Sequence, residues 1–404
     1  MRIILANSFH YRRGGDSNQF LLLVEALEQR GHEVATFAMH HPQNLPSRWG
    51  TYWVPHVEYR RELTALDRLR AGWRSVYSRA SHRNMARLIA DFAPDLVHFH
   101  SVQHHLTLAA VEACLTAGVP VVWTLHDYRT VCPATLLLRG TEICDRCSGG
   151  SFWHCVAGRC KSGEVSRSLA AVVESYATRM RGSLGAVGCY VAPSRFLAEK
   201  VLAMGLPARR VEVVPNPVSS NPAPALGRPR RGLLYVGRLT VEKGVDLLIE
   251  AVAGCDDLSL HVVGDGPDAR RLKALAARLH CDVVFDGWRG ADEVAACMSA
   301  AEALCVPSIW YENCPGVVLE AMASGLPVVA SDLGGLPELL EGGRAGWLAP
   351  PGDPQAWLRV ITEALRDETR TAQQAARAFA RVRERHDPDA FVDRLEVIYR
   401  SLAS

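Results

Sequence analysis

The chain has 404 residues and a formal net charge of +2. Hydrophobic residues make up 48% and charged residues 22%, which is the balance of a globular protein of about two domains. The small net charge argues against nucleic acid as a partner. No apolar run is long enough to span a bilayer and the N-terminus lacks a signal-peptide pattern, so we expect a cytoplasmic protein.

Short aliphatic runs alternate with amphipathic stretches in the first half of the chain. Buried parallel strands are predicted at RIILAN, HEVATFA, PDLVHFH, PVVWTLHD and GAVGCYVAP, and helices at 17–30, 104–117, 166–180 and 195–204. This alternation predicts βαβ units in a doubly wound sheet. We therefore assign residues 1–213 to a first Rossmann-like domain.

Residues 58–88 have a helical pattern and are strongly basic. We interpret this segment as a solvated helical hairpin. The alternative is a surface for anionic membrane lipids, which would place the protein peripherally at the inner face of the membrane.

A segment rich in Pro, Ser and Asn, residues 214–231, interrupts the alternation and is predicted to be an inter-domain linker. The strands GLLYVGR, LSLHVVGDG, DVVFDGW, EALCVPS and LPVVASD then predict a second Rossmann-like domain over residues 232–387. A last helix, 388–404, follows the D-x-D of Asp387 and Asp389, which we interpret as an N-cap rather than a metal site. Because ligands bind beyond the carboxyl ends of such strands, we expect a site in a cleft that the two domains face.

Two loops have residues that favour a diphosphate. After the strand that ends at Gly237, Arg238 and Lys243 flank a short loop before a helix, and two cations beside a helix N-terminus suit a diphosphate. An ordinary charged surface loop is the alternative. In the first domain, Gly14 and Gly15 follow the first strand and allow the backbone to approach a ligand closely.

A dinucleotide fingerprint also occurs in the second domain. Gly264, Gly266 and Ala269 have the G-x-G-x-x-A spacing after a strand, and Asp282 and Asp286 follow about 20 residues later. This pattern keeps an NAD-dependent oxidoreductase as an alternative, although it falls on a middle strand rather than on the first βαβ unit of its domain.

The stretch YENCPGVVLEAMASGLP holds two glutamates, Glu312 and Glu320, around a predicted helix start at Pro315. The two carboxylates would meet a ligand at different places along its length, and carboxylates accept hydrogen bonds from sugar and ribose hydroxyls. Between them lie further candidate ligand-binding residues: Asn313, Cys314, Pro315, Gly316 and Val317.

Together these motifs resemble those of glycosyltransferase family 4, whose members have the two-domain GT-B fold. Glu312 and Glu320 match the family's E-x7-E motif, and GRLTVEKG matches its diphosphate-binding loop. Gly14 and Gly15 match its N-terminal glycine loop, and TLHD matches its position at His126. The similarity covers nearly the whole chain.

The resemblance implies transfer of a sugar from a nucleotide-diphosphate donor, a UDP- or GDP-sugar, to an acceptor hydroxyl with retention of anomeric configuration. His126, Arg238, Lys243 and Glu312 would act at the reaction centre, and catalysis needs no metal. The implied donor-binding residues are Gly14, Gly15, Gly237, Arg238, Lys243, Gly264, Gly287, Trp288, Glu312, Asn313, Cys314, Pro315, Gly316, Val317 and Glu320. The acceptor would be a lipid-linked saccharide or a small glycoside, in polysaccharide, glycolipid or glycoside biosynthesis. A nucleotide-sugar epimerase of the same fold is the alternative.

Five of the twelve cysteines lie within residues 132–160, in the spacing C-x11-C-x2-C-x7-C-x4-C. A C-x2-C pair followed by two more cysteines suits tetrahedral coordination of Zn²⁺ by thiolates. Disulfides are not expected, because they do not persist in a reducing cytosol. We predict Cys144, Cys147, Cys155 and Cys160 as ligands of a structural zinc ion. Cys132 or His154 could replace one of them, and an iron–sulfur cluster or a set of free thiols are the alternatives.

Overall fold

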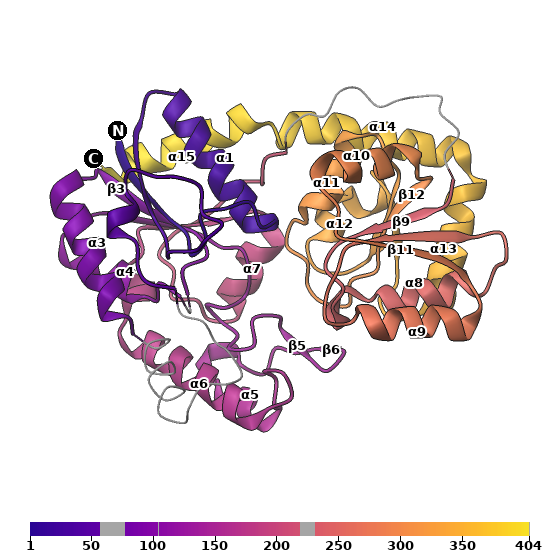
Figure 1. Cartoon of the computed structure of the whole chain (residues 1–404), viewed down its shortest axis with the longest axis horizontal. Helices are drawn as coiled ribbons and strands as arrows, with labels where there is room; N and C mark the ends of the chain where they lie inside the picture. Colours follow the sequence, from indigo (N-terminus) through magenta and orange to yellow (C-terminus); the bar gives the residue numbers. More distant parts are fainter. Residues whose placement is uncertain (57–76, 104, 219–230, 404) are drawn as a thin grey trace. The chain divides into compact units, whose positions relative to one another are not determined.

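The computed structural model describes residues 1–56, 77–103, 105–218 and 231–403, and helices and strands alternate along the chain (Figure 1). It divides into two compact units. The first unit comprises Met1–Leu137, Cys144–Val214 and Phe391–Ser404, and the second comprises Leu138–Ile143 and Pro215–Ala390. Most of the predicted linker and of the predicted basic hairpin lies outside the described residues. Within those residues, no helix has both the length and the apolar character that crossing a bilayer requires.

The first unit is built on a six-stranded parallel sheet with the strand order β2-β1-β3-β4-β7-β8. Its strands are β1 (Arg2–Ala6), β2 (Glu33–Phe37), β3 (Leu96–Phe99), β4 (Val121–Thr124), β7 (Cys189–Ala192) and β8 (Val211–Val213). Its helices are α1 (Gly15–Gln29), α3 (Arg79–Phe92), α4 (Ala109–Thr116), α5 (Trp153–Ala157), α6 (Val165–Met180) and α7 (Arg195–Ala203). Ile3, Ile4 and Leu5 are all fully buried, as a strand covered on both faces requires.

The last helix, α15 (Pro388–Ala403), completes the core of the first unit. Its buried residues Phe391, Val392, Leu395, Ile398 and Tyr399 join the cluster that contains Ile3, Leu5 and Phe20. At its surface Arg30 pairs with Asp393, and His32 Nε2 lies 3.1 Å from Glu396 Oε1. The amide of Ala390 donates to Asp387 Oδ1 at 2.9 Å, which confirms the predicted capping role of this aspartate.

The second unit is built on a six-stranded parallel sheet with the order β11-β10-β9-β12-β13-β14. Its strands are β9 (Leu233–Val236), β10 (Ser259–Val263), β11 (Asp282–Gly287), β12 (Ala303–Val306), β13 (Val328–Ser331) and β14 (Trp347–Ala349). Its helices are α8 (Val245–Val252), α9 (Ala269–Leu279), α10 (Ala291–Ala300), α11 (Gly316–Ala323), α12 (Leu336–Leu339), α13 (Pro354–Arg366) and α14 (Glu368–Arg385). A two-stranded antiparallel pair, β5 (Leu138–Arg139) and β6 (Glu142–Ile143), was not predicted.

Both faces of the second sheet are covered. Along β9, Leu233 and Tyr235 join one hydrophobic core, whereas Leu234 joins the other, because successive side chains of a strand point to opposite faces. Helices α8, α9 and α13 cover the first face, and α10, α11, α12 and α14 cover the second (Figure 1). Because both faces of this sheet are covered by apolar side chains, residues that could bind a polar ligand have to lie at the ends of its strands.

Candidate active site

In the second sheet the chain moves outward from β9 to β10 and β11, and then returns to place β12 on the other side of β9. Ligands of doubly wound sheets bind at such a reversal, beyond the carboxyl ends of the two strands. The loops that follow β9 and β12, residues 237–244 and 307–315, contain seven of the predicted donor-binding residues, among them Arg238, Lys243 and Glu312.

The two loops are fastened to each other. A Cβ atom on Gly244, whose φ is 65°, would lie 2.2 Å from the carbonyl oxygen of Pro307. Only glycine permits both this backbone conformation and this approach. In addition, the amide of Ile309 donates to the carbonyl of Glu242 at 3.0 Å. The short helical turn Val241–Lys243 is thereby held against the loop that carries Glu312.

Lys243 and Glu312 form an ion pair at this point. Lys243 Nζ lies 2.6 Å from Glu312 Oε1, and the hydroxyl of Ser308 donates to the same oxygen at 2.6 Å. The Glu312 side chain is 6% exposed, and Lys243 Nζ also lies 5.1 Å from the centre of the Trp310 ring. The structure therefore joins two predicted residues, and it adds Ser308 and Trp310, which the sequence analysis missed although both follow a buried strand.

The loop after β13 holds Glu312 from the other side. The amide of Gly335 donates to the carbonyl of Glu312 at 2.6 Å. A Cβ on Gly334 would lie 2.7 Å from that carbonyl oxygen, and a Cβ on Gly335 would lie 2.1 Å from the carbonyl oxygen of Asn313. These two glycines were also missed, and the available signal was a double glycine that begins two residues after the predicted strand LPVVASD.

Helix α11 begins beside this pair. Its first residue is Gly316, and Pro315 is the N-cap residue, so the prediction that Pro315 takes the first helical position was wrong by one residue. The extended conformation of Pro315, with ψ of 125°, turns the chain into the helix. The amides of Gly316 and Val317 lie in the first turn, where helical amides have no acceptor within the helix and attract negative charge.

Glu320 lies one turn into α11. The residue is exposed, yet the protein around its carboxyl group removes part of its hydration and raises the pKa. Arg238 and Trp288 are also exposed, with 78% of Trp288 accessible to solvent. Asn313 is buried, and the carbonyl of Cys314 accepts a hydrogen bond from Asn216 Nδ2 at 3.4 Å.

The G-x-G-x-x-A spacing has a packing explanation. A Cβ on Gly264 would lie 1.9 Å from the carbonyl oxygen of Gly237, and a Cβ on Gly266 would lie 2.2 Å from that of Leu239. The amide of Gly264 donates to the carbonyl of Gly287 at 2.7 Å. These glycines thus allow the loop after β10 to pack directly on the loop after β9, and an NAD site is not favoured.

The first unit has its own polar pocket. It lies beyond the carboxyl ends of β1, β3 and β4 and has a volume of about 280 Å³. Its lining includes Ser8, Arg13, Asp16, His100, His126 and Asp127. Gly14 and Gly15 adjoin it at the start of α1, with φ of 111° and 39°, values that favour glycine.

Three histidines lead from the core of the first unit to this pocket. His98 Nδ1 lies 2.6 Å from the Tyr399 hydroxyl, and its Nε2 lies 2.7 Å from Thr124 Oγ1. His100 Nδ1 lies 3.0 Å from His126 Nε2. Burial lowers the pKa of His126 and lowers that of His98 to about 3, so these rings are neutral near pH 7. His126 was predicted, whereas His100 was missed.

Two family models match the chain. "Glycosyl transferases group 1" matches residues 230–367, and "Glycosyltransferase Family 4" matches residues 13–221, just over half of the chain. The chain belongs to glycosyltransferase family 4. This glycosyltransferase is 27% identical to the phosphatidyl-myo-inositol mannosyltransferase of Mycobacterium leprae, over 97% of this chain and 94% of that protein. It is 34% identical to the amylovoran biosynthesis glycosyltransferase AmsK of Erwinia amylovora, over 42% of this chain and about half (45%) of that relative.

Solved structures confirm the predicted GT-B fold of the glycosyltransferase. Anabaena Alr3699/HepE in complex with UDP-glucose superimposes with a TM-score of 0.71 at 19% identity, with full coverage of both chains. The lipopolysaccharide biosynthesis glycosyltransferase WaaG superimposes with a TM-score of 0.67 at 17% identity, over 98% of this chain and 99% of that chain.

Proposed function

We propose that this glycosyltransferase moves a sugar from a nucleoside-diphosphate donor, a UDP- or GDP-sugar, to an acceptor hydroxyl with retention of anomeric configuration. The observation that supports this function best is the Lys243–Glu312 pair beside the start of α11, at the reversal of the second sheet. A cation, a buried carboxylate and first-turn amides at one place suit a ligand that carries both a diphosphate and hydroxyl groups.

Each donor part has a matching group in the second unit. Arg238, Lys243 and the first turn of α11 would neutralise the diphosphate. Glu312 would accept hydrogen bonds from the sugar, and Glu320, further along α11, would accept them from the ribose. Gly287 and Trp288, at the end of β11, would lie near the base.

The transfer breaks the bond between the anomeric carbon and the diphosphate oxygen, and forms a bond from that carbon to the acceptor oxygen on the same face. Positive charge grows on the sugar ring while negative charge grows on the departing phosphate. Lys243, Arg238 and the α11 amides stabilise the negative charge as it develops. The acceptor proton passes to the departing phosphate, so no side chain is required as the base. HepE, a structural neighbour, is known in complex with UDP-glucose, which supports a nucleotide-sugar donor.

The pocket of the first unit is the proposed acceptor site. Its lining combines neutral imidazoles with Ser8, Arg13 and Asp16, which suits an acceptor that presents hydroxyl groups. Relatives of the chain include a phosphatidyl-myo-inositol mannosyltransferase and a 2-deoxystreptamine glucosyltransferase. A lipid-linked saccharide and a small glycoside are therefore the two classes of acceptor to be assayed.

Calorimetric titration tests the donor class. UDP, GDP, ADP, dTDP and NAD would each be titrated into the wild-type protein, the Glu320→Ala variant and a Glu250→Ala control. Glu250 is an exposed carboxylate on α8 of the same unit. We expect one nucleoside diphosphate to bind with micromolar affinity, about tenfold more weakly after Glu320→Ala and unchanged after Glu250→Ala. Binding of NAD alone would overturn the proposal, and the anomeric coupling constant of the product sugar tests retention.

A further inference from the structure

Three residues of different chemistry meet on one side of the second sheet. His261 lies on β10, Asp286 on β11 and Cys297 on α10. Their ligand atoms, a ring nitrogen, a carboxylate oxygen and a sulfur atom, all lie within 4.8 Å of one another. The three residues come from three elements and are separated by 25 and 11 positions in the sequence, so only the fold brings them together.

The side chains meet on the face of the sheet that α10 covers. Leu260 and Val262 join the core on the first face, so His261, between them on β10, points to the opposite face. Cys297 packs against the core on that opposite face. Because β11 is an edge strand, the trio keeps access to solvent: the side chains of His261 and Asp286 are 47% and 20% exposed. A metal ion could therefore reach all three from solution.

An irregularity of the sheet lies at Asp286. Val262 of β10 pairs with Phe285 of β11. The next residue of β10, Val263, pairs with Gly287, which leaves Asp286 as an extra residue in the ladder. Bulges of this kind are rare between parallel strands and are over-represented next to active sites, where they re-aim a side chain. Here the extra residue is the one whose carboxylate faces the imidazole on β10.

The spacing of the two side chains suits a shared metal ion better than a direct hydrogen bond. His261 Nδ1 lies 3.5 Å from Asp286 Oδ2. A charge-assisted hydrogen bond would bring these atoms to about 2.7–2.9 Å. Zinc bonds of about 2.0–2.2 Å to nitrogen and oxygen, at tetrahedral angles, place the two ligand atoms roughly 3.4 Å apart. The observed separation matches the second value.

An arginine holds the carboxylate from its other oxygen. Arg289 Nη2 lies 3.8 Å from Asp286 Oδ1, and Arg289 Nη1 donates to Glu293 Oε1 at 3.0 Å. Glu293 lies one turn before Cys297 on α10. Carboxylates that bind metals commonly have such outer partners, which orient them. The Oδ2 atom of Asp286 is the one left to face His261.

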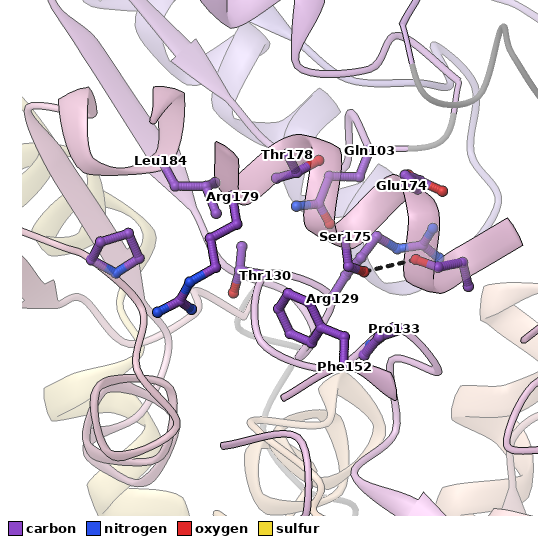
Figure 2. A pocket seen from close by; sticks show the side chains of 12 residues that line it. Gln103, Arg129, Thr130, Pro133, Phe152, Glu174, Ser175, Thr178, Arg179 and Leu184 are labelled. Carbon is purple, nitrogen blue, oxygen red and sulfur yellow. Dashed lines mark hydrogen bonds between the residues drawn. The ribbon is translucent and has the colours of Figure 1, made fainter. Parts of the chain in front are cut away.

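The cysteine segment and the cavity beside it differ from this trio. In the described chain, no three of the five cysteines in residues 132–160 have sulfur atoms within 4.8 Å of one another, so the zinc site predicted there stays a prediction. Figure 2 shows the neighbouring small cavity, whose lining includes Arg129, Arg179 and Glu174. Two guanidinium groups face a single carboxylate in that lining, so this cavity disfavours a cation.

We propose that His261, Asp286 and Cys297 bind a zinc ion through one nitrogen, one oxygen and one sulfur ligand, with water in the fourth position. Zinc accepts each of these ligand types, and sites with three protein ligands keep the fourth position open. Binding would form a bond between zinc and the sulfur atom and release the thiol proton to solvent. The thiolate and the carboxylate then balance the charge of the ion. The proposed sugar transfer does not use this zinc.

The position of the site indicates what the ion would do, and this role rests on the proposed function. Asp286 directly precedes Gly287 and Trp288, which would lie near the base of the donor. A zinc ion shared by β10, β11 and α10 would fix this end of the edge strand to the helix that covers it. We expect zinc to tighten nucleotide binding, because less conformational freedom is then lost when the nucleotide binds.

Cobalt titration tests the ligand set. The wild-type protein, Cys297→Ser, His261→Ala and the control Cys255→Ser would be stripped of metal with a chelator and titrated with Co²⁺. Cys255 is also partly buried in the second unit, but it packs against the core on the other face of the sheet. We expect the wild type and Cys255→Ser to bind about one more Co²⁺ per chain than the other two, with the absorption of a cobalt–thiolate bond. Equal stoichiometry in all four proteins would overturn the proposal, and the comparison cancels any metal bound elsewhere in the chain.

Alkylation of the wild-type protein gives a second test that does not depend on the folding of variants. Labelling with iodoacetamide would be followed by mass spectrometry, with Zn²⁺ present and with Zn²⁺ absent. We expect Zn²⁺ to slow the labelling of Cys297 and to leave that of Cys255 unchanged. Equal rates at Cys297 in the two samples would remove it from the ligand set, whatever the activity of the enzyme.

Calorimetry separates the role of the ion from the assignment of the donor. UDP and GDP would be titrated into the wild type and Cys297→Ser, each with and without Zn²⁺. We expect Zn²⁺ to raise nucleotide affinity about fivefold more in the wild type than in the variant, where only binding of Zn²⁺ by the diphosphate itself remains. An equal effect in both proteins would refute the bracing role. If neither nucleotide binds, the proposed donor and this role both fail, whereas the cobalt titration still decides the metal site.

Discussion

Lys243 and Glu312 are 69 positions apart in sequence but form one buried pair, because β9 and β12 are neighbours in the sheet. A buried carboxylate that lacks its cation would carry a large desolvation cost, so each residue constrains the position of the other. The glycines on both sides then bring three loops within backbone contact of the pair. The arrangement of the site therefore depends on the Lys243–Glu312 pair and on glycines that leave no room for a Cβ atom.

Replacing Glu312 by Gln should preserve the size of the side chain but remove the charge that faces Lys243 and the proposed sugar. We expect kcat to fall about 100-fold, as for other losses of a group that acts on the transition state. Ser308→Ala, which removes one hydrogen bond to the same oxygen, should cost about tenfold. Steady-state kinetics with the identified donor would measure both effects, and an unchanged kcat in Glu312→Gln would contradict the assigned role.

Donor affinity should also depend on the ionisation of Glu320. Loss of part of its hydration raises the pKa of this carboxyl above its ordinary value of 4.5, and the ionised form accepts hydroxyl hydrogen bonds more strongly than the protonated form. Affinity should therefore fall as the pH decreases, and the fall should begin at a higher pH than for an ordinary glutamate. Calorimetry from about pH 7 to about pH 5 measures this. Glu320→Gln corrects for titration of the phosphate, and the same pH profile in both proteins would refute the prediction.

Among the elements, the loops at the carboxyl ends of the strands in the second sheet pack on one another beside the start of α11. The loop after β10 packs on the loop after β9 through Gly264 and Gly266, and the loop after β13 packs on the loop after β12 through Gly334 and Gly335. Parallel strands place all these loops at one edge of the sheet, so each loop supports the next. The glycine spacing that resembles a dinucleotide fingerprint is one product of this packing.

Gly264→Ala should disturb the loop after β9, residues 237–244, although Gly264 itself follows the neighbouring strand β10. The added methyl group would overlap the carbonyl of Gly237, at a backbone φ of 138° that favours glycine. We expect the free energy of unfolding to fall by about 3 kcal/mol and nucleotide affinity to fall with it. Gly290→Ala is the control, since its methyl group would find only an ordinary contact, at 3.6 Å. Urea unfolding and calorimetry measure the two quantities, and equal results for both variants would show that the overlap is relieved at little cost.

In the whole molecule, the chain returns at its end to complete the unit in which it began. Helix α15 supplies five side chains to the core of the first unit and a hydroxyl group, from Tyr399, to the buried His98. His98 in turn lies beside His100, with ring centroids 4.5 Å apart, and His100 contacts His126 in the pocket. The last helix therefore supports the histidines of the proposed acceptor site.

Tyr399→Phe tests this support. Loss of the hydroxyl leaves one ring nitrogen of His98 buried without its partner, which should lower the free energy of unfolding by about 1–3 kcal/mol. Tyr11→Phe is the control, because Tyr11 packs on His41 through its ring, with centroids 4.6 Å apart. Thermal unfolding of both variants measures the difference. Equal melting temperatures would mean that the His98 hydrogen bond contributes little.

The sequence by itself determined the classes of structure that depend on local pattern. Alternating apolar and amphipathic stretches specified two doubly wound sheets. Gly14 and Gly15 could be selected because they follow a recognisable strand, whereas Glu312, Glu320 and His126 also needed the resemblance of their motifs to those of family 4. Short strands such as β5, β6 and β14 were missed, because two or three residues are too few to show a period.

The tertiary structure alone decided which distant residues meet. The pairing of Lys243 with Glu312, the support from Gly334 and Gly335, and the contact of His100 with His126 all depend on strand order, which is set by the packing of whole sheets. Local periodicity reports which face of an element is buried, whereas a site requires side chains from several elements to converge.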